Sequence, residues 1–477
     1  MIVAAALLVA GAGAAEEART WTSRSGKSMT ARFIEIEESR VVLENDAGQR
    51  TRIAADALCD ADREFLAGRG VLRIAKPRTW TTLKGRTTEA RFKELTGSNV
   101  VLTATNGASL AIPLGALSVP DRAYVVQEAP IPLAAWLPGE WSGWLVEGQN
   151  LWQMRFRLGP GPSATFKTDL VCGLTREEYT LARDKKMPPK LVATETPGIV
   201  EQSFAMQLTG SNITFTGSAA KRLFGKANGE WQPDTLTGVL APGGTIHGTW
   251  GTPPSTGHFY MARTDLPFVP AFPDLPRGKV HHLACGSWHY RLYIPKSYDP
   301  LKPAPVLVND SAGANAQPLH TGMAEELGWI MIGLTESANN TSWFLLIDNG
   351  AAALHDLRQR VNLDHRRYYF TGYSGGARRS SRRALLWGDQ TAGLLLIAAG
   401  HAGYQNRPPL RIPAFLLAGE SDMNKGEVQG LYDREKPEGR TCQIIIHPGG
   451  HTWGRAEDHV AGLRWLESQW KEPGTKP

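Results

Sequence analysis

Short apolar runs alternate with segments of helical spacing in the C-terminal part of the chain. Three runs have the length and the β-branched content of buried strands: 290–294, 304–308 and 329–334. Helical spacing follows in Leu354, Leu357 and Val361, and it recurs in a last helix predicted over 457–470. Strands that alternate with helices predict an α/β region over residues 278–471, built on a doubly wound, mostly parallel sheet.

A different pattern, alternation of single apolar and polar side chains, fills residues 135–265. Met154, Phe156 and Leu158 alternate with arginines, which predicts half-buried antiparallel strands. Three later runs predict a meander that closes on itself: 236–240, 244–250 and 259–261. Trp141 and Trp144 are either exposed platforms on which a sugar stacks or, the commoner role of large aromatic side chains, parts of the core.

Residues 19–127 contain an internal repeat with a constant offset of 59 residues. The segment Arg19–Thr22 recurs as Arg78–Thr81, and further pairs match without a gap, among them Ala31–Phe33 with Ala90–Phe92, Val41–Leu43 with Val100–Leu102, Leu58 with Leu117 and Asp62 with Asp121. Each unit shows short alternating strands, separated by turns, and then a brief helical piece. The repeat therefore predicts two small β-barrels, over 19–68 and 78–127.

Composition and charge narrow the classes of function. The chain of 477 residues is 42% hydrophobic and 21% charged, as in ordinary globular proteins, and its formal net charge of +6 is small for this length. No block of basic residues alternates with aromatic ones, so nucleic acid is not an expected partner. The four cysteines, Cys59, Cys172, Cys285 and Cys442, lack the spacing of metal ligands and leave disulfide pairing open. We expect neither a metal nor an organic cofactor.

The first residues have the character of an export signal. Residues 1–15 are small and apolar and end in Gly11–Ala15, which resembles the apolar core and the cleavage site of a secretory signal, although a basic start is missing. The alternative is a buried N-terminal helix. Because no other segment approaches the ~20 apolar residues of a membrane span, we expect a secreted or periplasmic protein without such a span.

Prolines mark the connection between the middle region and the α/β region. They recur every third residue in the segment 266–277, at positions 267, 270, 273 and 276. Such spacing favours an extended, semi-rigid spacer. We therefore expect a linker that tethers the α/β region at a set distance.

The strongest chemical signal is the segment Gly372–Gly376, in which Ser374 is central. A β-branched and aromatic run precedes it and a run without helix breakers follows it, so the order is strand, sharp turn, helix. A serine held in such a strained turn needs glycine neighbours, because Cβ atoms would crowd the crossing of strand and helix. This is the setting of a nucleophile elbow.

Two further candidates follow the ends of later predicted strands. The apolar run 412–418 leads to Asp422, and the strand predicted over 442–446 leads to His451. The order Ser374, Asp422, His451 is that of serine hydrolases with parallel sheets. In such a triad the histidine takes the serine proton while the aspartate fixes the imidazole. Taken singly, the three residues are a turn serine, an acid at a helix start and a loop histidine; their order and positions together favour the triad.

Several segments resemble known families. Residues Asp364–Gly376, with Gly419–Asp422 and Gly450–Trp453, are similar to secreted bacterial esterases of the polyhydroxybutyrate-depolymerase and feruloyl-esterase group, over about residues 280–471. The resemblance implies an α/β-hydrolase fold and ester hydrolysis by Ser374, Asp422 and His451. The repeats resemble the Sla-one homology domain, a Src-homology-3-like barrel that binds short peptides, although packing modules are the commoner role here. The middle region is weakly similar to lipocalin-like barrels.

The oxyanion loop departs from the pattern of that esterase group. Where the family has His-Gly, this chain has Asn309–Asn315, so the backbone N–H groups expected to stabilise the oxyanion are those of Gly375 and of Ser311 or Ala312. Asp310 would disfavour a nearby oxyanion, which keeps a second hypothesis open: a degenerate hydrolase in a non-catalytic binding protein. Four arginines on the helix after Ser374 must be paired or lie at a surface: Arg378, Arg379, Arg382 and Arg383.

Loops at one edge of the sheet supply candidates for the substrate pocket. Trp343, His401, Tyr404 and Trp453 are placed there by the predicted elements, each with ordinary loop packing as the alternative. The longest candidate lid is the loop predicted over 335–350, too short to cover a long acyl chain. We therefore expect a short-acyl or aromatic-acyl ester, attached to carbohydrate, as substrate, with peptidase activity as a lesser option. The β domains are expected to bind peptide or glycan.

Overall fold

The computed structural model describes residues 18–37, 40–69, 72, 75–147, 150–159, 163–172, 199–217, 220–224, 227–231, 235–251, 257–400, 412–437 and 439–471. The predicted signal segment 1–15 lies outside these residues, so its role stays a prediction. Among the helices that the structure describes, none is both long and apolar enough to cross a membrane.

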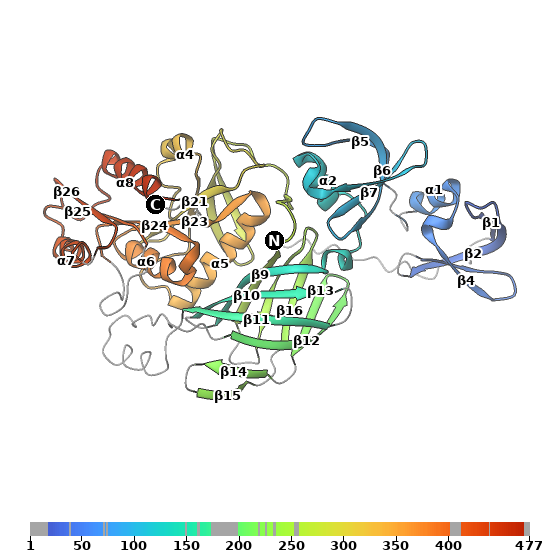
Figure 1. Ribbon diagram of the computed structural model, residues 1–477, viewed down its shortest axis with the longest axis horizontal. Coiled ribbons are helices and arrows are strands. Elements are labelled where there is room, and N and C mark those ends of the chain that lie inside the picture. Colours follow the sequence, from blue (N-terminus) through green and yellow to red (C-terminus); the bar gives the residue numbers. More distant parts are fainter. Residues whose placement is uncertain are drawn as a thin grey trace. The chain divides into compact units, whose positions relative to one another are not determined.

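Each of the two repeats folds into its own four-stranded antiparallel sheet followed by a short helix (Figure 1). The first has the order β1-β2-β3-β4 and ends in α1 (Asp60–Gly68); its strands are β1 (Arg19–Thr22), β2 (Ser28–Glu37), β3 (Arg40–Glu44) and β4 (Arg50–Ala54). The second has the order β5-β6-β7-β8 and ends in α2 (Val119–Gln127); its strands are β5 (Arg78–Thr81), β6 (Thr87–Thr96), β7 (Asn99–Ala104) and β8 (Ser109–Pro113).

The repeated residues make the same contacts in both units. Trp21 and Trp80 are 1% exposed and occupy the two cores. The carboxylate of Asp62 accepts a hydrogen bond from the backbone N–H of Thr22 at 2.6 Å, and Asp121 accepts one from Thr81 at 2.7 Å. Matching residues therefore hold the first turn of each helix against the first strand of its sheet.

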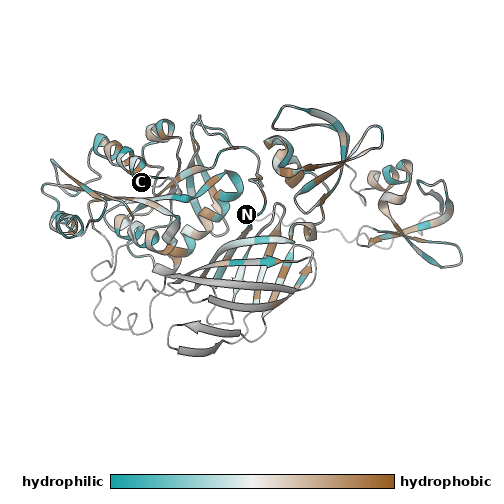
Figure 2. Ribbon diagram, viewed as in Figure 1, coloured by the Kyte–Doolittle hydropathy of each residue, from teal (hydrophilic) through white to brown (hydrophobic). Residues whose placement is uncertain are grey.

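The middle region is a closed antiparallel barrel of eight strands, in the order β10-β11-β12-β13-β16-β17-β18-β9. Its strands are β9 (Gly139–Glu147), β10 (Asn150–Leu158), β11 (Ser163–Cys172), β12 (Ile199–Thr209), β13 (Asn212–Gly217), β16 (Thr235–Ala241), β17 (Thr245–Trp250) and β18 (Gly257–Arg263). A separate hairpin of β14 (Ala220–Phe224) and β15 (Ala227–Trp231) lies between β13 and β16 in the chain. Buried and exposed positions alternate along β16. Figure 2 shows hydrophobic and hydrophilic residues interspersed along the coloured strands of the barrel.

The C-terminal region is built on an eight-stranded sheet in the order β19-β20-β22-β21-β23-β24-β25-β26. The last six strands in this order pair in parallel, and β19 and β20 form an antiparallel edge. The strands are β19 (Val280–Cys285), β20 (Trp288–Tyr293), β21 (Ala304–Ser311), β22 (Ile330–Leu334), β23 (Leu363–Tyr373), β24 (Thr391–Ile397), β25 (Ala414–Gly419) and β26 (Cys442–His447).

Helices cover both faces of this sheet (Figure 1). On one face lie α4 (Thr321–Leu327) and α8 (Ala456–Gln469); on the other lie α5 (Trp343–Arg360), α6 (Gly375–Trp387) and α7 (Lys425–Glu435). The alternation of side chains along a strand explains the two cores: Tyr368 and Phe370 of β23 enter the core under α5 and α6, whereas Tyr369 enters the core under α8. Apolar side chains on both faces are typical of central parallel strands.

The barrel packs directly against the α/β region. Trp141 and Leu145 of β9 point into the barrel core, whereas Trp144 and Val146 join the core under α5 and α6. The rings of Trp144 and Trp387 lie 5.9 Å apart, and both are almost fully buried. Because side chains alternate along β9, one face of this strand lies in the barrel core and the other lies in the core of the α/β region. The prediction of a spacer that holds the two parts at a set distance is therefore wrong.

The segment after β18 packs against neighbouring elements instead of extending freely. The backbone N–H of Ala271 donates to the carbonyl of Gln359 at 2.8 Å, and the Arg360 guanidinium lies 3.9 Å from the ring centre of Phe272. The prediction that the chain contains several separate β-sheets is confirmed. The resemblances of the individual sheets to named folds stay predictions.

Candidate active site

Ser374 lies at the sharp turn between β23 and α6, with φ 53° and ψ −119°. Its backbone N–H donates to the carbonyl of Ile397 at 2.8 Å, which ties the turn to β24. A Cβ on Gly372 would lie 2.5 Å from the carbonyl carbon of Gly376, and one on Gly376 would lie 2.5 Å from the carbonyl oxygen of Asp310. Only glycine fits at both positions, so the turn presents a half-buried serine at the start of the helix.

His451 and Asp422 lie next to Ser374. The imidazole Nε2 of His451 is 3.0 Å from Ser374 Oγ, and its Nδ1 is 2.9 Å from Asp422 Oδ1. Asp422 is only 6% exposed, and it also accepts a hydrogen bond from the backbone N–H of Asn424 at 2.7 Å. Glu420, the other acidic residue after β25, is exposed. The structure thus brings the three predicted residues into one chain of contacts.

The chemistry of the partners fixes the direction of these hydrogen bonds. An ionised carboxylate only accepts, so His451 Nδ1 carries a proton and donates it to Asp422. In the neutral imidazole Nε2 is then the acceptor and faces the Ser374 hydroxyl. The arrangement is able to remove a proton from Ser374 and to return it.

Tyr373, the residue before Ser374, holds the loop that carries His451. Its hydroxyl donates to the His451 carbonyl at 2.8 Å, and its ring stacks on that of Trp453, with centres 5.0 Å apart. His459 on α8 also contacts the Trp453 carbonyl through Nε2, and burial lowers the His459 pKa to about 4. Trp453, predicted for the substrate pocket, is therefore half-buried and packs against Tyr373.

The loop after β21 lies against the start of α6. A Cβ on Gly376 would come within 3.1 Å of Ser311 Cα, and the carbonyl of Ala312 accepts a hydrogen bond from the Asn339 backbone at 3.0 Å. Ala314 and Asn315 both have left-handed backbone conformations, with φ 65° and 55°. In the described part of the chain no backbone acceptor engages the N–H of Gly375 or Ala312. Both groups are thus available to an incoming oxyanion.

Asp310 points away from this loop, into the interior. It is fully buried and 2.9 Å from Arg383 Nε, and it accepts hydrogen bonds from the hydroxyls of Ser337 and Ser380. Arg379 Nε lies 4.0 Å away. Arg379 and Arg383 face the Asp310 carboxylate inside the protein and compensate its negative charge. The expectation that this charge would disfavour a nearby oxyanion therefore no longer applies.

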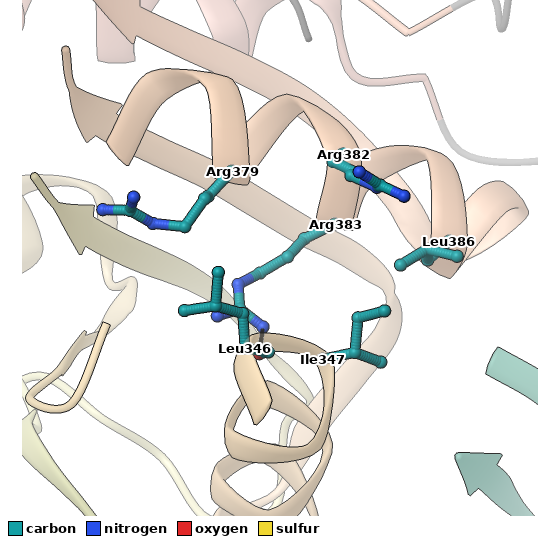
Figure 3. Close-up of a pocket in the computed structure, with 6 residues that line it drawn as sticks. All are labelled: Leu346, Ile347, Arg379, Arg382, Arg383 and Leu386. Carbon is teal, nitrogen blue, oxygen red and sulfur yellow. Dashed lines mark hydrogen bonds between the residues drawn. The ribbon is translucent and has the colours of Figure 1, made fainter. Parts of the chain in front are cut away.

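The arginines of α6 have separate roles. Arg378 pairs with Glu427 at the surface, whereas Arg379, Arg382 and Arg383 are buried. Figure 3 shows these three projecting from α6, with Leu346 and Ile347 on the facing α5. Arg379 also donates to the Ser311 carbonyl at 2.6 Å and to Asn339 Oδ1 at 3.0 Å. It therefore links the helix to both loops beside Ser374.

The structure places none of the other three predicted pocket residues on a described loop. His401 and Tyr404 lie outside the described residues. Trp343 is the first residue of α5 and not a loop residue, because Ser342 caps the helix by accepting from the Leu345 N–H. The loop predicted over 335–350 is therefore shorter in the structure, where it ends at Ser342. Asn339, which this loop brings to Gly375, was not predicted from the sequence, because no local pattern distinguishes it from other loop residues.

No group of three or more metal-ligating side chains of suitable geometry occurs among the described residues. Cys59, Cys285 and Cys442 are free thiols, and burial raises the pKa of Cys285 and Cys442. A raised pKa disfavours the thiolate, so neither Cys285 nor Cys442 is activated as a nucleophile.

Comparisons with known proteins give only remote structural likenesses. No family model matches the sequence, and no curated protein matches it significantly. One similar solved structure is a mutant of the feruloyl esterase module from Clostridium thermocellum, complexed with sinapinate: identity 13%, coverage 42% of this chain and 93% of that chain, TM-score 0.34.

Two further similar solved structures come from other organisms. A hyperthermophilic esterase from Pyrobaculum calidifontis is 14% identical over 41% of this chain and 86% of its own, with a TM-score of 0.32. The fluorophosphonate-binding serine hydrolase F of Staphylococcus aureus is 13% identical over 41% of this chain and 100% of its own, with a TM-score of 0.32. At these TM-scores the likenesses carry no conclusion about this chain.

Proposed function

We propose that the protein is a serine esterase with an α/β-hydrolase domain, in which Ser374 is the nucleophile, His451 the general base and acid, and Asp422 the residue that orients the imidazole. One observation carries the proposal: an uninterrupted series of contacts from Ser374 Oγ through His451 to the buried Asp422, starting at a strained turn between strand and helix. An ordinary turn serine has no need of such partners.

The reaction follows from these positions. His451 Nε2 takes the proton as Ser374 Oγ bonds to the ester carbonyl carbon, and the carbonyl electrons move to oxygen, where the N–H groups of Gly375 and Ala312 stabilise the charge. When the intermediate collapses, the alcohol leaves with the proton from His451 and an acyl-enzyme remains. Water, deprotonated by His451, then attacks the acyl carbon; the acid is released and Ser374 is regenerated.

The substrate class is part of the proposal. The described loop from Thr335 to Ser342 is even shorter than predicted, which favours an open site, and Trp453 and Tyr373 provide aromatic surface beside His451. An open site buries little of a long acyl chain, whose binding relies on about 0.8 kcal/mol per CH₂. We propose short-acyl or aromatic-acyl esters of carbohydrate as substrates of an exported enzyme, with peptide or glycan as ligands of the β domains.

Labelling with a fluorophosphonate probe tests the proposal directly. The wild-type protein should label at Ser374, and Ser374→Ala should abolish labelling and lower esterase turnover by several orders of magnitude with an unchanged Tm. Ser381→Ala, on the same helix, serves as a control that retains labelling. An unlabelled, folded wild-type protein would favour the non-catalytic binding protein, and faster hydrolysis of a long-chain triglyceride than of a feruloylated or acetylated polysaccharide would overturn the substrate class.

A further inference from the structure

We propose that the side-chain amide of Asn339 supplies an additional hydrogen-bond donor to the oxyanion; this inference rests on the proposed esterase function. Asn339 lies in the loop between β22 and α5, and its backbone N–H donates to the Ala312 carbonyl at 3.0 Å. Its loop is thereby fastened to the one that provides the Ala312 donor.

The amide group of Asn339 lies directly on Gly375. A Cβ built on Gly375 would be 1.8 Å from Asn339 Oδ1, 2.8 Å from Cγ and 3.2 Å from Nδ2. The side chain therefore touches the residue whose backbone N–H is the other proposed donor. Asn339 is exposed and Gly375 only half-buried, so both are accessible to a substrate that enters beside Ser374.

Arg379 determines which end of the amide is free to donate. A guanidinium has donors and no acceptor, so the atom 3.0 Å from Arg379 Nη1 must be the oxygen of Asn339. Arg379 is itself fixed, because it is 4% exposed, donates to the Ser311 carbonyl at 2.6 Å and faces Asp310. The Asn339 NH₂ group is left for another acceptor, and none engages it within the described residues.

A developing oxyanion is the acceptor that suits this group. As Ser374 Oγ bonds to the ester carbon, negative charge accumulates on the carbonyl oxygen next to the Gly375 N–H. A preorganised side-chain amide at such a position typically contributes a factor of about 10² to 10³ to kcat. The contribution is specific to the transition state, so KM should change little.

Substitution of Asn339 tests the inference. Asn339→Ala removes the donor, and Asn339→Asp keeps the shape and the acceptor for Arg379 while replacing the donor with a charge that repels the oxyanion. We expect kcat to fall by about 10² to 10³ in the alanine variant and further in the aspartate variant, with KM within a few-fold of wild type. Asn340→Ala, at an exposed neighbour in the same turn, should retain wild-type kcat.

The outcomes separate this inference from the proposed function. If Ser374→Ala abolishes turnover while both Asn339 variants keep kcat within about three-fold of wild type, the esterase stands and the role of Asn339 is overturned. If kcat fell in the Asn339 variants and fell equally in Asn340→Ala, the role of Asn339 would also be overturned, since a disturbance of the whole loop would then explain the loss. A folded wild-type protein with neither labelling nor turnover would overturn both.

Discussion

Two fully buried carboxylates, Asp310 on β21 and Asp348 on α5, are held in opposite ways. Asp310 faces the guanidinium groups of Arg383 and Arg379 and the hydroxyls of Ser337 and Ser380. Asp348 accepts from the Tyr260 hydroxyl at 2.7 Å and from Trp288 Nε1 at 2.8 Å, and His258 Nδ1 lies 2.9 Å from its Oδ1. The first has permanent cations beside it, and the second has neutral donors and one titratable ring.

The difference separates a cluster with arginine partners from one that contains a titratable imidazole. Arginine keeps its charge across the pH range in which proteins are studied, so Arg379 and Arg383 remain cations beside Asp310. At the barrel, the contact with Asp348 raises the His258 pKa, whereas burial lowers the pKa of nearby His355 well below its usual value. Neither ring nitrogen of His355 has a hydrogen-bond partner among the described residues. The contact between the barrel and the α/β region therefore contains two imidazoles whose pKa values are shifted in opposite directions.

The largest loss of stability is expected from Asp310→Asn. The variant leaves Arg383 buried without a counter-charge, and breaking a buried ion pair in this way typically costs about 3 to 5 kcal/mol. Urea unfolding at pH 7.5 measures the free energy of unfolding. Asp274→Asn, which alters an exposed pair with Arg277, is the control and should have almost no effect. If Asp310→Asn lowered the free energy of unfolding by less than about 1 kcal/mol, the buried arginines would not need Asp310 as a counter-charge.

A smaller loss is expected from Asp348→Asn. The new amide keeps one oxygen as an acceptor, and the two closest partners, Tyr260 and Trp288, are neutral donors. The free energy of unfolding should therefore fall by about 1 to 3 kcal/mol, the cost of one buried hydrogen bond left unmade. The same urea experiment compares the two variants. A destabilisation equal to that of Asp310→Asn would remove the distinction between the two clusters.

The smallest effect concerns pH and His355. Its folded-state pKa is depressed, chiefly by burial and also by Arg358 and His247, while its unfolded pKa is about 6.5. Protons then bind preferentially to the unfolded chain, so the free energy of unfolding should fall as pH drops below about 6.5. A single such group contributes at most about 1.4 kcal/mol per pH unit. His355→Leu should therefore reduce the loss of stability between pH 6.5 and 5.0, measured by urea unfolding.

His258 provides the opposing control. Its pKa is raised, so its contribution to stability is complete below about pH 6.5 and disappears as pH rises through its folded-state pKa. His258→Gln should consequently make the loss of stability toward acid slightly steeper. An identical pH dependence for wild type, His355→Leu and His258→Gln would show that these rings do not titrate with folding.

Much of the local structure was predictable because it depends on local sequence. The offset of 59 residues revealed two equivalent units, and the glycines around Ser374 indicated the turn that the structure contains. The sequence also placed Asp422 and His451 beyond strand ends, where parallel strands bring their carboxyl ends to one edge. The structure adds the distances of 2.9 and 3.0 Å, and the catalytic role of these residues stays a proposal.

What the sequence did not predict depends on contacts between distant segments. Arg383 pairs with Asp310 across 73 positions, and no local pattern reveals this partner. The start of α5 was missed because Ser342 acts as its cap within a stretch that has the composition of a loop. Asn339 became a candidate only when its side chain was found on Gly375.

The packing of Trp144 on Trp387 limits how freely evolution can recombine this protein. A barrel that met the α/β region only through a proline-rich connection would be exchangeable for another by a change in that connection alone. Here the outer face of β9 completes the core beneath α6, so a transplanted barrel must bring side chains that fit Trp387, and an α/β region expressed without the barrel would expose that ring to water. The two parts are therefore expected to have been inherited together.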